Sequence, residues 1–453
     1  MKSYITLVIV FSMVTAGFPL VIGAETEDSH HVIAGVPYVG QTTDYYCAYA
    51  SCAMVLGYYG VNVSVEEVLY ESGVGYALVY SPPTLPRLPV SCTGSCRWSL
   101  DRLFLARLHG LNYSEWRSTA QMSEDDRWTA YWIRVKENLS NNHPVITDVD
   151  PVLLPSIRNA VRKELGVTNT MWMRLTNIFW NNAPCNVYHS IVLVGFNETN
   201  QTVCFNDPSA GLYHHPEEGT YVWMPLSTFK KAHHRLFVDT QYTPYLAYSV
   251  QVFTDTGDQP LNTTEIYQQT LERNLKKLSG DPTVYDDHII NDWGCTTLGF
   301  HTVQALHQDF SPGLRNRITT APLYILVCMV QLLSLEYKLG WMFDALLPES
   351  RKVTTCPNIL NKYRQIAIEK ESVSQYLLSI HDELTNETLK TQCLHDAFLL
   401  QQEANQWTRL ADDFARFLEK GMFMMFLRAL TIIQNMYSTS ETILLIETQL
   451  LEI

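Results

Sequence analysis

The spacing of hydrophobic residues divides the chain into two parts. Over residues 32–253, short apolar runs typical of strands alternate with stretches of helical spacing, which predicts a mixed α+β domain. Over residues 264–453, apolar residues recur at steps of three and four with few strand signals, so this part is predicted to be all-α. Residues 254–263 between them are polar and carry Gly and Pro, as a linker does.

An apolar run near the N-terminus bears on the compartment. Lys2 precedes the run Ile5–Ile22, and the small residues Gly23 and Ala24 follow it. This layout predicts a secretory signal peptide over residues 1–24. An uncleaved membrane anchor is the alternative, because about 18 apolar residues can span a bilayer. Either reading places the body of the protein outside the cytosol, secreted or extracytoplasmic, with a membrane contact only if the segment is retained.

A second apolar segment, Leu323–Phe343, raises the question of a membrane span. Glu336 and Lys338 lie within it, and each charge is costly in hydrocarbon. We therefore expect a buried core helix here.

Composition excludes one class of partner. Hydrophobic residues make up 46% and charged residues 17%, which is ordinary for a globular protein. The formal net charge is −14, and the sequence has no basic stripe. Nucleic-acid binding is not expected, because phosphates require clustered Lys and Arg.

Two residue types agree with an extracellular glycoprotein. Asn-x-Ser/Thr glycosylation signals begin at Asn62, Asn112, Asn138, Asn197, Asn200, Asn262 and Asn386. Ten cysteines outside the cytosol predict disulfides, with Cys92 and Cys96 as the nearest local pair. A zinc site at this pair is the alternative, although it lacks a second pair of ligands.

Cys47 is predicted to begin a helix. Ala50, Ala53 and Met54 follow it at helical spacing, and Gly60 suits the C-terminal end. The partial positive charge at a helix N-terminus favours the thiolate, which is the nucleophilic form of cysteine. Alone, a helix-starting cysteine is more often structural than catalytic.

Gln41, six residues before Cys47, is placed to assist the same chemistry. Its side-chain amide could stabilise an oxyanion together with a backbone N–H at the helix start. A loop glutamine without a catalytic role is the alternative. Cys52 lies on another side of the same helix, so it is expected in the core or in a disulfide.

A predicted hairpin supplies a base and its partner. The β-rich run 188–196 begins near His189, a turn follows at 197–201, and 202–206 reads as the returning strand before Asp207. Antiparallel pairing would bring His189 and Asp207 to the same end of the sheet. The imidazole can then take the cysteine proton while the carboxylate fixes its tautomer.

In this arrangement the sequence resembles the C39-like cysteine peptidases over roughly residues 34–250. The matching positions are Gln41, Cys47, Met54, Leu56, Tyr58-Tyr59-Gly60, His189, Val192, Gly195 and Asp207-Pro208. The resemblance implies a papain-like fold and a thiol peptidase that hydrolyses a peptide or protein substrate through a thioester. Its catalytic residues would be Cys47, His189, Asp207 and Gln41.

The chain also departs from the family pattern. Ala48 stands where family members often carry glycine, a sterically mild change. The stretch from about 151 to 185 reads as an insertion that could act as a lid. Because neither a transmembrane bundle nor an ATPase motif is present, the leader-peptide specificity of export-linked members is not expected.

Two other functions stay open. The same triad could transfer the acyl group to an amine or thiol, and residues 291–306 faintly resemble helical segments of butirosin-type acyltransferases. The second open function is that of a non-catalytic, peptidase-like binding protein, with a protein partner on the helical domain. No cofactor or metal is expected, because side chains and backbone dipoles suffice for the chemistry and the paired histidines of the chain would point to opposite faces of a strand.

Overall fold

The computed structural model describes residues 30–43, 45–81, 88–91, 99–119, 122–164, 166, 189–239, 248–286, 297–309, 359–420 and 426–453. Several predicted features lie outside these residues: the signal peptide 1–24, the pair Cys92 and Cys96, most of the insertion beyond residue 164, and the segment 323–343.

An antiparallel sheet forms the centre of the first part of the chain. The main strands lie in the order β4 (Leu111–Arg117), β9 (Ser249–Asp255), β5 (Val145–Val149), β6 (His189–Asn197), β7 (Thr202–Asn206) and β8 (Val222–Pro225). The short strand β1 (His30–Val32) pairs with the far end of β6. Residues of β6 are buried on both faces, which explains why its sequence is continuously apolar rather than alternating.

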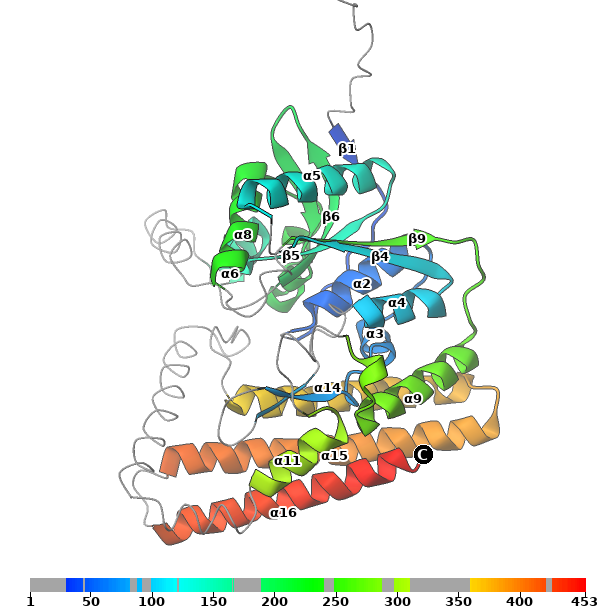
Figure 1. Cartoon of the computed structure of the whole chain (residues 1–453), viewed down its shortest axis with the longest axis vertical. Helices are drawn as coiled ribbons and strands as arrows, with labels where there is room; N and C mark the ends of the chain where they lie inside the picture. The colour runs from blue at the N-terminus through cyan, green and yellow to red at the C-terminus, as the bar shows by residue number, and fades with distance from the viewer. Residues whose placement is uncertain are drawn as a thin grey trace, which may run out of the picture.

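Helices cover both faces of this sheet (Figure 1). On one face lie α5 (Glu124–Ser140) and α8 (Leu226–Asp239), and on the other lie α2 (Cys47–Tyr58) and α4 (Ser99–Leu108). The helix α3 (Val65–Glu71) packs against α2 and α4 on the side away from the sheet. The predicted combination of sheet and helices is confirmed for this part of the chain.

The second part is helical wherever the structure describes it, as the apolar spacing predicted. Its helices are α9 (Thr263–Ser279), α11 (Phe300–Asp309), α14 (Ile359–Ile380), α15 (Glu387–Lys420) and α16 (Phe426–Leu451). A small hairpin of β2 (Leu78–Ser81) and β3 (Leu88–Ser91) belongs to the first part and packs against α14 and α11. No helix among the described residues has the length and apolarity that crossing a bilayer requires.

A continuous hydrophobic core joins the two parts. The ring of Tyr70 on α3 stacks on Tyr267 of α9, with centroids 6.1 Å apart and planes 14° apart. Tyr376 of α14 packs on the same ring at 5.5 Å. Val373 and Leu377 of α14 belong to the same buried cluster as the sheet. The carboxyl-terminal helices are therefore packed directly onto the layer of helices that contains Cys47 (Figure 1).

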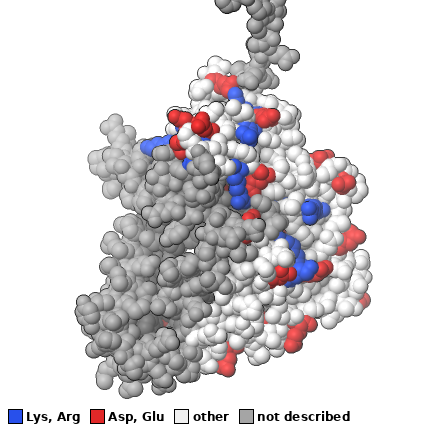
Figure 2. Space-filling view, in the orientation of Figure 1, with Lys and Arg blue, Asp and Glu red and all other residues white. Residues whose placement is uncertain are grey.

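The visible surface carries charges of both signs. On the face in Figure 2, Lys and Arg side chains of the described residues lie beside Asp and Glu.

Candidate active site

Cys47 is the first residue of α2, as predicted. Tyr46 is the N-cap residue, and Gly60, with a φ of 86°, follows the C-cap residue Tyr59 at the other end of the helix. Only 6% of Cys47 is exposed. The sulfur is therefore almost fully buried at the N-terminal end of a helix.

The predicted hairpin is also confirmed. Strands β6 and β7 pair antiparallel, with Val192 opposite Asn206 and a bulge between Leu193 and Gly195. A Cβ atom on Gly195 would come within 2.7 Å of a backbone oxygen of the neighbouring strand β1. Glycine at this position thus allows three strands to meet at the bulge.

The hairpin brings an imidazole and a carboxylate together. Nε2 of His189, at the start of β6, lies 2.7 Å from Oδ1 of Asp207, which directly follows β7. His189 is 4% exposed and Asp207 is fully buried. The Cys47 side chain forms a hydrogen bond with His189. Three residues that are distant in sequence therefore form one hydrogen-bonded chain: Cys47, His189 and Asp207.

The electrostatics of this hydrogen-bonded chain favour the charged forms of His189 and Asp207. Burial lowers the pKa of His189, but the charge and hydrogen bond of Asp207, together with Cys47, outweigh it and raise the pKa to about 10. Burial raises the pKa of Asp207, but His189 and the hydrogen bonds of Ser156 and Ser209 outweigh it and hold that pKa below its usual value. The site is thus arranged to keep an imidazolium beside a carboxylate.

Two serines that the sequence did not single out complete the surroundings of Asp207. The Ser156 hydroxyl, on α6 (Pro155–Glu164), donates to Oδ2 of Asp207. The Ser209 backbone N–H donates to Oδ1 at 2.9 Å. The Ser209 hydroxyl lies 2.9 Å from Nε2 and 3.3 Å from Nδ1 of His189. Asp-Pro-Ser is a typical Asx-turn sequence that could have revealed Ser209, whereas nothing near Ser156 in the sequence points to Asp207.

Gln41 lies beside the same group of residues but its amide is engaged. Nε2 of Gln41 donates to the Thr43 carbonyl oxygen at 3.1 Å. Oε1 of Gln41 accepts a hydrogen bond from the Ser209 hydroxyl at 3.5 Å. The Gln41 side chain would have to leave the Thr43 carbonyl before it could donate to a substrate oxyanion.

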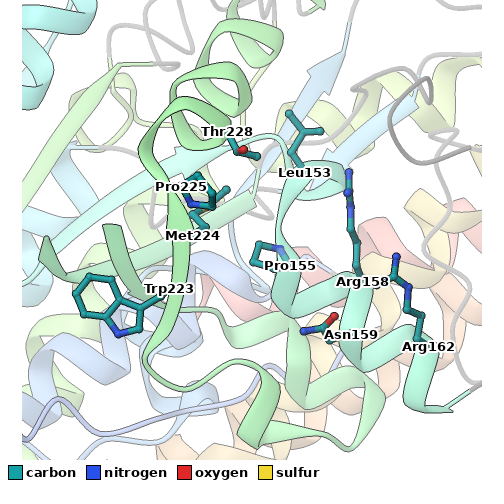
Figure 3. A pocket seen from close by; sticks show the side chains of 9 residues that line it. All are labelled: Leu153, Pro155, Arg158, Asn159, Arg162, Trp223, Met224, Pro225 and Thr228. Atoms are coloured by element: carbon teal, nitrogen blue, oxygen red, sulfur yellow. The ribbon is translucent and has the colours of Figure 1, made fainter. Parts of the chain in front are cut away.

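A surface hollow lies on another side of α6. It has a volume of about 230 Å³ and lies between α6, β8 and α8. Figure 3 shows Arg158 and Arg162 on α6 at one side and Trp223, which is 41% exposed, at the other. Cys47, His189 and Asp207 do not line it. We therefore place the candidate chemistry at the hydrogen-bonded chain and not in this hollow.

Four of the cysteines lie in the described part of the chain. Cys47, Cys52, Cys204 and Cys393 are buried there and form no disulfide, and Cys52 belongs to the hydrophobic core. In the same residues, no three His, Cys, Asp or Glu side chains gather in a way that could hold a metal ion. The remaining cysteines, and with them the predicted disulfides, lie outside the described residues: Cys92, Cys96, Cys185, Cys295, Cys328 and Cys356.

Comparison with known families agrees with the resemblance in the sequence. Residues 33–233 match the model of the Peptidase_C39 like family. This range contains Cys47, His189 and Asp207, and it indicates a peptidase-type function. No curated protein matches the chain.

Proposed function

We propose that this chain, whose residues 33–233 match the Peptidase_C39 like family, is a secreted thiol peptidase with a papain-like fold. It would hydrolyse peptide bonds with Cys47 as nucleophile, His189 as acid and base, and Asp207 as the residue that orients His189. The observation that carries the proposal is the buried chain of hydrogen bonds from Cys47 through His189 to Asp207.

In the first step, the Cys47 thiolate attacks the carbonyl carbon of the scissile bond, and a carbon–sulfur bond forms. Negative charge moves to the carbonyl oxygen, where backbone N–H groups at the start of α2 would donate to it. The imidazolium of His189 gives its proton to the leaving amine, and a thioester is left on Cys47. His189 then takes a proton from water, whose hydroxide attacks the thioester and releases the carboxylic acid.

Gln41 would contribute the second oxyanion donor when substrate is bound. Its amide is already in contact with the residues around His189, and rotation away from Thr43 would free Nε2. Catalytic hydrogen bonds are often incomplete in a free enzyme and form only with substrate present.

A labelling experiment tests the roles of Cys47 and His189. A chloroacetamide probe should modify Cys47 selectively near neutral pH, and a His189→Ala variant should react at least tenfold more slowly, because the imidazolium that favours the thiolate is gone. Peptide mass spectrometry identifies the labelled residue.

The control is a Cys52→Ala variant, which removes a buried thiol of the same helix and should label like the wild type. Equal labelling rates in the wild type and His189→Ala would contradict the assignment of His189 as the base.

Secretion is a separate part of the proposal. The glycosylation signals at Asn62, Asn112 and Asn200 have exposed asparagines, as glycan attachment requires. Protein recovered from the medium of secreting eukaryotic cells should lose mass on treatment with an N-glycan amidase. Retention in the cytosol without glycans would contradict a secreted location.

A further inference from the structure

The backbone immediately before the candidate nucleophile is in an uncommon conformation. Tyr45 has a φ of 71°, in the left-handed region that residues with side chains rarely occupy. Such a conformation is strained and persists only where the surrounding structure holds it. Tyr46, the next residue, caps α2 without a side-chain hydrogen bond to the helix. The start of α2 therefore depends on contacts from outside the helix.

One such contact comes from the carboxyl-terminal helices. The hydroxyl groups of Tyr46 and Ser372, which are 326 residues apart in sequence, form a hydrogen bond of 3.2 Å. Tyr46 is fully buried, and its ring packs edge-to-face on Tyr49 one turn along α2, at 5.8 Å. The side chain thus connects the residue before Cys47 to α14.

Other contacts hold α14 against the first part of the chain. Nζ of Lys370, two residues before Ser372, donates to the Gly75 carbonyl oxygen at 2.5 Å and lies 2.8 Å from the carboxylate of Glu403 on α15. Lys370 and Glu403 are both fully buried. Because α14 also packs along α3, which itself packs on α2, Ser372 lies on a helix that is packed against the first part of the chain (Figure 1).

We propose that α14 is part of the catalytic scaffold, with Tyr46 and Ser372 acting as positioning residues that hold the start of α2 and so aim the Cys47 sulfur at His189. The inference rests on the proposed thiol chemistry, and it assigns a role to the helical part of the chain. The carboxyl-terminal helices would be required for the reactivity of Cys47 rather than being a separate module.

The test compares Tyr46→Phe, Ser372→Ala and the double variant, each of which removes only hydroxyl groups. Cys47 alkylation should slow by about three- to tenfold in each single variant, since one hydrogen bond is lost. The pH profile of alkylation should move to higher pH, because a frayed helix start favours the thiolate less. The double variant should alkylate at the same rate as the single variants, because both residues act through one contact. Ser372→Thr keeps the hydroxyl group and should alkylate at the wild-type rate.

Ser374→Ala is the matched control. It removes a hydroxyl on the same helix that donates to the Ala397 carbonyl oxygen of α15 at 2.7 Å. This variant should lose stability while Cys47 reacts at the wild-type rate. If the Tyr46 and Ser372 variants alkylate at the wild-type rate, or if their effects simply add, the inference is overturned.

Hydrogen exchange separates this inference from the proposed function. The peptide that spans residues 45–50 should exchange faster in Tyr46→Phe and Ser372→Ala, and not in Ser374→Ala, whether or not Cys47 is reactive. An inert Cys47 in the wild type would refute the proposed function alone. Unchanged exchange in the variants would refute the support of α2 by α14.

Discussion

The imidazole of His189 lies between two groups that favour its charged form, Asp207 on one side and Cys47 on the other. Burial alone would make the ring neutral, yet its pKa is raised to about 10. The charge and hydrogen bond of the carboxylate, together with Cys47, therefore outweigh desolvation at this residue. Catalysis through an imidazolium depends on this balance, because a neutral ring could not protonate a leaving amine.

Asp207→Asn should reverse the balance. Without the carboxylate, burial is the dominant influence, and the pKa of His189 should fall from about 10 to near or below the ordinary value of 6.5. Imidazole NMR shifts followed from about pH 5 to about pH 11 measure this change directly, because this range includes both the raised and the lowered pKa of His189. The linked stability has a defined sign: the protonated ring stabilises the fold fully below 6.5, and this contribution is lost as pH rises toward 10.

Ser156→Ala is the variant to compare with Asp207→Asn. It removes one hydrogen bond to Asp207 but leaves the carboxylate in place. The His189 pKa should stay well above 6.5, while the free energy of unfolding falls by about 1.5–3 kcal/mol, as for a hydrogen bond to a charged group. A His189 titration that is the same in the wild type and Asp207→Asn would show that Asp207 does not control the ring.

Individual residues differ in how far the sequence could predict their positions. His189 and Asp207 flank a hairpin whose strands and turn can be read from local pattern, so their proximity follows from antiparallel pairing. Ser156 reaches the same carboxylate from a helix in the region that reads as an insertion, and no local pattern specifies that contact. The sequence predicts that Gln41 presents its amide to an oxyanion, but in the free protein the amide donates to the Thr43 carbonyl oxygen, because several acceptors lie nearby and sequence does not rank them.

At the scale of elements, the turn after β7 is held by a close backbone approach. The Asp207 N–H donates to the Gly219 carbonyl oxygen at 2.7 Å, and a Cβ atom on Gly219 would overlap the Asp207 carbonyl oxygen. The Tyr38 hydroxyl also donates to the Asp207 carbonyl oxygen, at 3.1 Å. The carboxylate therefore depends on a glycine twelve residues further along the chain for its position.

Gly219→Ala should displace the Asp207 backbone. We expect a loss of about 1–3 kcal/mol in the free energy of unfolding, as for other steric overpacking, together with slower alkylation of Cys47. Urea denaturation and the chloroacetamide assay measure the two effects. Thr220→Ala, at the neighbouring position, removes only a local hydrogen bond to Pro216 and should leave the alkylation rate unchanged. Wild-type stability and reactivity in Gly219→Ala would contradict the close approach.

For the molecule as a whole, buried carboxylates gather where the helical part meets the first part. The Tyr76 hydroxyl donates to Asp396, and burial raises the pKa of Asp396 to about 7. Burial and the neighbouring Glu403 raise the pKa of Glu447 well above its ordinary value. Lys370 is the cation that faces both glutamates, at 2.8 Å from Glu403 and 3.9 Å from Glu447.

These shifts predict greater stability at acidic than at alkaline pH. A carboxyl whose pKa is raised on folding binds a proton more tightly in the folded state, so its cost is absent below the unfolded value of 3.8, grows as pH rises to about 7 and is constant above that. The free energy of unfolding should therefore be higher at pH 5 than at pH 8, by up to about 3 kcal/mol for Asp396 alone.

Asp396→Asn should reduce this pH dependence, whereas Asp382→Asn, whose side chain is 86% exposed, should not. Urea denaturation of the three proteins at pH 5 and pH 8 measures the difference. A wild-type stability that rises with pH over this interval would contradict the raised pKa values.

The relation between the two parts of the chain is the feature that the sequence described least. Apolar spacing predicts that α9 and α14 each have a buried face, and both segments are helical as predicted. Spacing does not say which surface such a face meets. Tyr267 and Tyr376 meet Tyr70 of α3, and this contact joins regions that the pattern had divided at a polar linker.

Peptide cleavage by the purified protein tests the central claim most directly. A peptide library is incubated with the wild type and with Cys47→Ala and is read by mass spectrometry, with and without an added amine. We predict hydrolysis products with new carboxylic acid ends from the wild type alone. Products that persist in Cys47→Ala, or the absence of products from a wild type that carries a reactive Cys47, would contradict it, and amide products formed only with the amine would favour acyl transfer.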